Sequence, residues 1–283
     1  IEGTPILLPQ IDWGGASPGY VECEFPLFPY LLGQLYKIVG IHEWLGRGLS
    51  AILSALTIIL VIRIGQHCFD PISGWWGGLF FAILPLNIYY GRTLQAESLL
   101  LLLSALSIER LIAWKNTGSL LSLFTSWLMF CLACLIKVLP LIWLGIPLFV
   151  LLSLNHKLTT RSPLKHLVQD LVKRLRSPWP WIYGSTVFLI GAIWYLHAYQ
   201  LGQESGFSFG FWGESSDRSS LDMLFNLQLW LNLFLRVAIR NLAIIGLPIM
   251  LLGLWKSRNQ AGGQFLISGL FGIFICTVIA LRA

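Results

Sequence analysis

The chain has 283 residues, of which 56% are hydrophobic and only 11% are charged, and its formal net charge is +6. Soluble domains usually carry about 25% charged residues, so this composition excludes a water-soluble enzyme built around one core. The mean hydropathy is +0.73, and the apolar residues fall in runs long enough to cross a hydrocarbon layer of about 30 Å. The composition therefore indicates a polytopic membrane protein.

The pattern predicts an all-α membrane protein with about eight transmembrane helices. A polar and aromatic segment at residues 1–48, rich in proline and glycine, precedes a transmembrane domain at residues 49–283. Within that domain lie a basic loop at 155–178 and a Gly/Ser-rich acidic loop at 202–231. The expected spans cover residues 49–66, 74–91, 95–114, 119–136, 138–154, 180–201, 232–254 and 264–281.

The charges separate the two sides of the expected bundle. The loops on one side, near 63–73, 109–118, 155–178 and 255–264, carry a net charge of +8, and the rest of the chain carries −2. By the positive-inside rule the basic loops face the cytoplasm. Residues 1–48, the 202–231 loop and the C-terminus then lie outside. The basic composition is thus a signal of topology, and it excludes nucleic acid as a partner.

The first residue, Ile1, is not a methionine, and no signal peptide follows it. Because an outside segment of this length needs a way across the membrane, we expect a transmembrane helix before residue 1 and interpret the chain as a fragment of a longer protein. Cys131 and Cys134 form a C-x-x-C within an apolar run. With no second pair and no histidine nearby, they are interpreted as packing residues.

Acidic residues mark the first outside segment as a candidate site. Glu22 and Glu24 directly precede residues 31–39, where leucine, isoleucine and valine recur at helical spacing. This spacing predicts a short juxtamembrane helix in the interface. A polar substrate and a lipid-borne one could meet there, although both carboxylates also fit the alternative of solvated loop charges.

The outside turn near residue 90 and the end of the fourth span add further candidates. Tyr90 and Arg92 precede Glu97 at a helix entrance, where arginine suits a phosphate and glutamate complements the helix dipole. Lys137 interrupts an apolar run at the outer boundary. It is interpreted either as a phosphate ligand or as an anchor that reaches the headgroups.

Two arginines and a histidine are the remaining candidates. Arg236 and Arg240 share one helix face near the outer end of the seventh span, where they would suit a phosphate or pyrophosphate or an anionic lipid. His197 lies at the outer end of its span. It is a candidate base or metal ligand, or an interface residue with its polar groups satisfied.

The chain contains no phosphate-cradling glycine loop, no G-x-S-x-G and no H-E-x-x-H. Cationic side chains without a nucleotide motif favour an already activated substrate that arrives in the membrane, such as a polyprenyl-phosphate sugar. Attack of an acceptor hydroxyl on its anomeric carbon needs a carboxylate base and cationic stabilisation of the leaving phosphate.

Several stretches resemble the bacterial membrane glycosyltransferases of the GT-C superfamily, in the group related to protein O-mannosyltransferases and aminoarabinose transferases. The stretches are Pro9–Trp13, Glu24–Leu31, Gly46-Arg47, Pro85–Arg92, Glu97–Leu99, Leu135–Lys137 and, more weakly, Trp194–Ala198. The resemblance implies a polyprenyl-phosphate-sugar donor, inverting transfer of a hexose or pentose to an extracytoplasmic acceptor, and a location in the bacterial inner membrane.

The resemblance also implies roles for the candidates. The donor-phosphate set is Arg92, Lys137, Arg236 and Arg240, and the substrate loop comprises Glu22, Glu24, Tyr90 and Glu97. Relatives bind a divalent metal through an acid of the first loop and a distant histidine, which would be Glu24, or Glu22, with His197.

In this family the catalytic aspartate directly follows the first transmembrane helix, so we expect it upstream of residue 1, and Glu24 is a candidate base within the chain. We therefore expect purified 1–283 alone to be inactive in a lipid-linked-donor assay, and detectable sugar transfer would contradict this expectation. Two other functions stay open: a transporter or flippase for lipid-linked saccharides, and a non-catalytic membrane subunit.

Overall fold

The computed structural model describes residues 6–11, 19–154, 158–161, 163–205, 226–236 and 246–282. Two short strands, β1 (Gln10–Ile11) and β2 (Gly19–Tyr20), pair antiparallel near the start of the chain. The helices are α1 (Leu27–Val39), α2 (Glu43–Cys68), α3 (Pro71–Ile83), α4 (Pro85–Tyr90), α5 (Glu97–Thr117), α6 (Leu120–Ile136), α7 (Pro140–Trp143), α8 (Gly145–Ser153), α9 (Leu164–Leu175), α10 (Pro178–Ser205), α12 (Leu227–Arg236), α13 (Gly246–Ser257) and α14 (Ala261–Arg282).

The predicted helical membrane fold is confirmed at the level of helix content, but the number of spans is not. Within the described residues, three helices are long and apolar enough to cross a membrane: Glu43–Cys68, Pro178–Glu204 and Ala261–Ile279. Two shorter apolar helices cover Leu120–Ile136 and Pro140–Ser153. The figure of eight spans therefore stays a prediction.

Two expected spans are interrupted because proline lacks a backbone N–H and disfavours helix in the residue before it. Pro85 begins α4 directly after α3 ends at Ile83, so the expected span 74–91 is two helices. The expected span 138–154 is likewise divided between α7, which ends at Trp143, and α8, where Pro147 has no N–H to donate to the Trp143 carbonyl. The expected span 232–254 includes the end of α12 and much of α13, and its residues 237–245 lie outside the described part of the chain.

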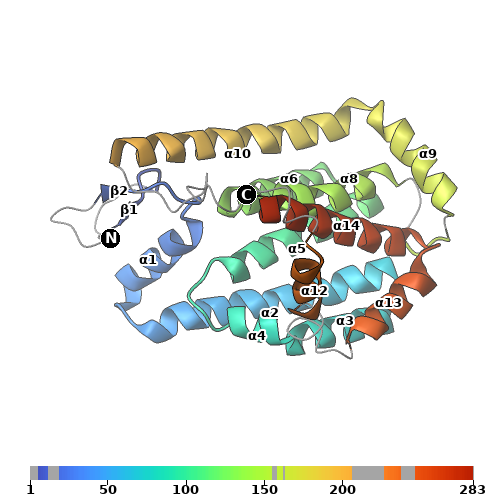
Figure 1. The fold of residues 1–283 in the computed structure, drawn as a ribbon, viewed down its shortest axis with the longest axis horizontal. Coiled ribbons are helices and arrows are strands. Elements are labelled where there is room, and N and C mark those ends of the chain that lie inside the picture. The colour runs from blue at the N-terminus through green and yellow to red at the C-terminus, as the bar shows by residue number, and fades with distance from the viewer. Residues whose placement is uncertain are drawn as a thin grey trace.

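Helix α5 lies at the centre of the bundle and packs against both α2 and α6 (Figure 1). Leu111 and Ile112 on α5 and Ile136 on α6 are almost fully buried in the same apolar cluster. Every 18-residue stretch of α5 contains three charged residues, which explains why it is not among the three apolar spans. Two of these charges are compensated, because the buried Glu109 carboxylate pairs with Arg110 and with Arg63 of α2.

The long helix α10 runs along one edge of the bundle (Figure 1). The β1–β2 ribbon lies beside its C-terminal end, and the helix α9 precedes its N-terminal end. Hydroxyls connect α10 to α6: Tyr183 bonds Ser126 at 2.9 Å, and the Trp127 indole donates to Thr186 at 2.9 Å. Helix α9 occupies residues expected as a basic loop, and α10 continues into the expected loop at 202–231.

Helices α2 and α3 approach closely because glycines line their contact. A methyl group added at Gly74 would lie 2.5 Å from the Ile62 carbonyl oxygen and 2.8 Å from the Gln66 nitrogen, both backbone atoms of α2. Backbone atoms cannot move aside as a flexible side chain can, so the contact requires glycine. At Gly77, on the same helix, an added methyl group would meet nothing within 4 Å.

We predict that Gly74→Ala destabilises the fold by about 1–3 kcal/mol through overpacking. Gly77→Ala is the matched control and should raise stability by up to about 1 kcal/mol, because alanine has the higher helix propensity. Thermal unfolding of both variants in detergent measures the difference. Equal unfolding temperatures would contradict the close α2–α3 contact.

Candidate active site

An ion pair between Lys137 and Glu97 forms the centre of the candidate site. The Lys137 ammonium donates to Glu97 Oε1 at 2.8 Å, and both side chains are partly buried. Lys137 lies directly after α6 in extended conformation, and Glu97 is the first residue of α5. A carboxylate in the first turn also interacts favourably with the helix dipole. The fold thus joins two groups that are 40 residues apart in sequence.

Glu24 lies in the electrostatic range of this pair. The Phe25 N–H donates to the Leu135 carbonyl at 3.1 Å, which attaches the first loop to the end of α6 and brings Glu24 toward Lys137. Burial raises the pKa of the Glu24 carboxyl above its ordinary value, Lys137 opposes that rise, and Glu97 adds to it. A carboxylate with a raised pKa is suited to accept a proton near neutral pH.

Lys137 stays charged in this setting. Burial acts to lower the pKa of its ammonium, but the hydrogen bond to Glu97 and the charges of Glu24 and Glu97 raise it, and the net pKa is above the ordinary value. Tyr90 adds a smaller electrostatic contribution of the same sign. The site therefore holds one persistent cation facing two carboxylates.

Glu22 is buried, with only 4% of its surface exposed. It lies against Gly202 of α10, where an added methyl group would be 2.7 Å from the Glu22 Cβ. Its Oε1 is buried and has no hydrogen-bond partner among the described residues. The alternative of a solvated loop charge is thus wrong for Glu22, because packing of the loop against α10 covers it.

Aromatic side chains toward the C-terminal end of α10 hold the first loop in place. Phe25 meets Trp194 edge to face at 4.8 Å between ring centroids. The Tyr195 hydroxyl donates to the carbonyls of Cys134 and Leu135, both at 3.2 Å. The sequence pattern alone did not single out these three rings. A Trp-Tyr pair near the end of an apolar helix is the sequence feature that could have identified two of them, because such rings combine apolar packing with a polar tip.

Among the described residues, no contact places a further candidate cation in this cluster. Arg92 is exposed in the turn between α4 and α5, and no ion pair to it occurs within the described residues. Arg236 ends α12, but its side chain lies outside the described part, as does Arg240 entirely. Of the four cations expected at the donor phosphate, Lys137 is the one placed beside Glu97 and Glu24.

The metal prediction finds no support in the described residues. They contain no group of three or more His, Cys, Asp or Glu side chains arranged to hold a metal ion. The Nε2 atom of His197 lies 2.8 Å from the Leu7 carbonyl oxygen, a hydrogen bond that commits this nitrogen to the first segment. The pairing of Glu24 with His197 around a divalent ion stays a prediction.

All five cysteines are free thiols, and Cys131 and Cys134 are buried within α6. Their place in the apolar cluster agrees with packing residues.

Comparison with known families identifies a match to part of the chain. A family model described as dolichyl-phosphate-mannose-protein mannosyltransferase matches residues 23–173. The matched segment includes Glu24, Glu97 and Lys137, the three charged groups that the fold brings together. Neither the curated proteins nor the solved structures contain a significant match to this chain.

The electrostatic arrangement predicts two opposite shifts at Glu24. Lys137→Met should raise the pKa of the Glu24 carboxyl, because it removes the cation that stabilises the charged form. Glu97→Gln should lower that pKa, because it removes a like charge. Infrared difference titration of the carboxylic C=O band measures both, with Glu24→Gln to assign the band. A Glu24 pKa that does not respond to either substitution would contradict the cluster.

Proposed function

The chain belongs to the dolichyl-phosphate-mannose-protein mannosyltransferase family of GT-C membrane glycosyltransferases, and we propose on that basis that it transfers a sugar from a polyprenyl-phosphate donor to an extracytoplasmic acceptor hydroxyl with inversion. The observation that carries the proposal is the convergence of Lys137, Glu97 and Glu24 from three separate segments.

Lys137 is proposed to bind the donor phosphate. An ammonium has three N–H donors, so Lys137 can keep its bond to Glu97 and still donate to a phosphate oxygen. The Glu97 carboxylate orients the lysine and preserves its charge. As the sugar leaves, negative charge grows on the phosphate, and a fixed cation in a partly buried site stabilises it more strongly than water would.

Glu24 is the candidate base. In the proposed step the acceptor oxygen forms a bond to the anomeric carbon while the bond from that carbon to the phosphate oxygen breaks. The hydroxyl proton passes to the Glu24 carboxylate, and the electron pair leaves with the phosphate toward Lys137. The raised pKa of Glu24 brings its proton affinity closer to that needed near neutral pH.

The other predicted contacts fit around this pair. Tyr90 and Glu22 flank the loop that would receive the substrate, and Arg92 is free to meet an incoming phosphate from the exposed turn. Arg236 and Arg240 remain proposed phosphate ligands. We propose the face that bears Glu24 as extracytoplasmic, since the basic residues of the 155–178 segment would then face the cytoplasm.

We predict that Lys137→Gln lowers transfer by at least about 100-fold, the loss typical of removing one stabilising donor from a transition state. Glu24→Gln should lower it by about 100- to 10,000-fold if the carboxylate is the base. The measurement uses membranes containing the complete protein, polyprenyl-phosphate mannose with a radiolabel as donor, and recovery of the label in a covalent product.

Lys37→Gln is the matched control, because Lys37 is an exposed lysine on α1, and it should leave transfer unchanged. Wild-type rates in Lys137→Gln would contradict the phosphate assignment, and wild-type rates in Glu24→Gln would contradict the base. Movement of the labelled lipid across the bilayer without any covalent product would instead support the transporter alternative.

A further inference from the structure

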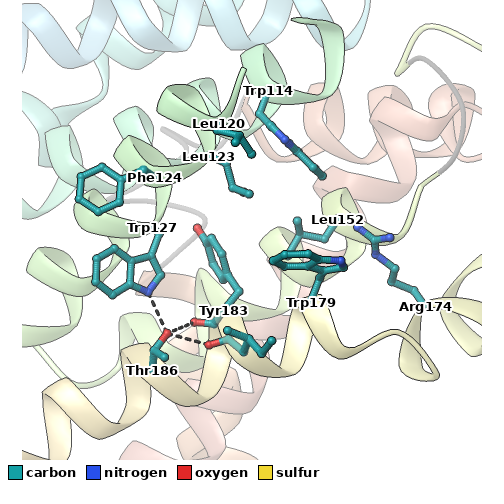
Figure 2. A pocket seen from close by; sticks show the side chains of 11 residues that line it. Trp114, Leu120, Leu123, Phe124, Trp127, Leu152, Arg174, Trp179, Tyr183 and Thr186 are labelled. Atoms are coloured by element: carbon teal, nitrogen blue, oxygen red, sulfur yellow. Dashed lines mark hydrogen bonds between the residues drawn. The ribbon is translucent and has the colours of Figure 1, made fainter. Parts of the chain in front are cut away.

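A second candidate binding site is a cavity of about 650 Å³ between α6, α9 and the first turns of α10 (Figure 2). Its size falls within the range of about 300–1,000 Å³ that is typical of small-molecule sites. The wall is mostly apolar and aromatic, with Trp114, Trp127 and Trp179 among the lining residues.

The two hydroxyls of the wall and the Trp127 indole are already paired within the protein. The Trp127 indole donates to the Thr186 hydroxyl, which in turn donates to the Ile182 carbonyl at 2.7 Å (Figure 2). The Tyr183 hydroxyl bonds Ser126. Because these groups already have hydrogen-bond partners within the protein, they do not require a polar ligand. This part of the cavity is therefore suited to a hydrocarbon chain.

Arg174 also lines the cavity, and it carries a polar atom that is not paired within the described residues. Its Nε atom is buried and has no hydrogen-bond partner among the described residues. Arg174 also acts electrostatically on Lys115, whose ammonium donates to the carbonyls of Leu151 and Leu154, while Asp170 is the nearby acid. Two neighbouring cations and an unused guanidinium N–H favour an anion, and arginine binds phosphate through several parallel N–H donors.

The helix that carries Arg174 has the pattern of a helix lying on a membrane. Leu167 and Leu171 of α9 pack against the protein core, whereas Val168 and Val172 are exposed on its surface. Lys173, Arg174 and Arg176 follow near its end. Trp179 and Trp181 at the start of α10 are also exposed. Exposed apolar residues beside basic residues and tryptophans are typical of contact with an anionic lipid surface.

The cavity lies at the opposite end of the bundle from the candidate active site. Helix α5 begins at Glu97 in the active site and passes Trp114 in the cavity wall near its end. At a rise of 1.5 Å per residue these positions are about 26 Å apart along the helix. The cavity therefore serves the other membrane surface.

We propose that this cavity binds one anionic phospholipid from the leaflet that α9 contacts. One acyl chain occupies the aromatic cavity between α6 and α10, and the headgroup phosphate is held by Arg174. The proposal does not depend on the transferase activity. Such a lipid would fill the space between α6 and α10 and link α9 to the bilayer.

The test uses the complete protein, delipidated in detergent and titrated with phosphatidylglycerol or phosphatidylcholine, with native mass spectrometry to measure the affinity for the first bound lipid. We expect phosphatidylglycerol to bind about fivefold more tightly, the equivalent of about 1 kcal/mol for one basic residue at an anionic surface. Arg174→Gln should remove this preference. Lys173→Gln is the matched control, because Lys173 is exposed and does not line the cavity.

A second pair of variants tests the cavity itself. Leu123→Trp fills the space that the acyl chain would occupy, so the affinity for both lipids should fall. Leu121→Trp adds the same ring on the exposed side of α6 and should leave both affinities unchanged. Thermal unfolding identifies a variant that fails to fold, in which case the arginine and lysine pair still decides the proposal.

Three results would overturn the proposal. Equal affinity for the two lipids in the wild type would show that the cavity does not select an anionic lipid, because both headgroups carry a phosphate and only their net charges differ. Equal losses in Arg174→Gln and Lys173→Gln indicate a diffuse basic surface without a site. Displacement of phosphatidylglycerol by polyprenyl phosphate at equal or lower concentration assigns the cavity to the prenyl chain of the donor.

Discussion

The ion pair between Lys137 and Glu97 is the interaction on which the candidate active site depends. It joins the break after α6 to the first turn of α5, so it fixes two helix ends at the same level. A partly buried charge is costly when its partner is lost, and this cost keeps the two ends together. The attachment of Phe25 to Leu135 then brings Glu24 within reach of the same cation.

Helix α5 begins at this ion pair and ends in chemically different surroundings, so the two ends of the bundle differ in chemistry. Its residues 98–108 are uncharged and mostly buried among α2 and α6. The charged groups of α5 lie at Glu97, where the helix begins, and in its second half at Glu109, Arg110 and Lys115. Carboxylates surround one lysine at the first end, and basic residues exceed acidic ones at the other. Sugar transfer is proposed at the first end and lipid binding at the second.

The two glutamates of the first loop, Glu22 and Glu24, have different environments because the fold buries them differently. Glu22 is covered by α10 and approaches Gly202, while Glu24 interacts electrostatically with Lys137 and Glu97. Both have the same chemistry in the sequence and lie two residues apart. Their separate environments follow from aromatic packing at the end of α10, where Trp194 and Tyr195 hold the loop and the end of α6.

Composition and periodicity alone determined the helical membrane fold and the helix after the first loop, because apolar runs and their spacing are local properties. The family resemblance came from short sequence motifs. The breaks at Pro85 and near Pro147 were readable from proline chemistry but lie inside spans that were expected to be continuous. Charge balance predicted which loops share a side. The sequence could not decide which candidate charges meet, since Glu97 and Lys137 come together only through the packing of α5 on α6, and Arg92 remains outside that contact. Nor could it show the cavity beside Arg174, because that space is created by residues of several helices whose distance apart is set only by tertiary packing.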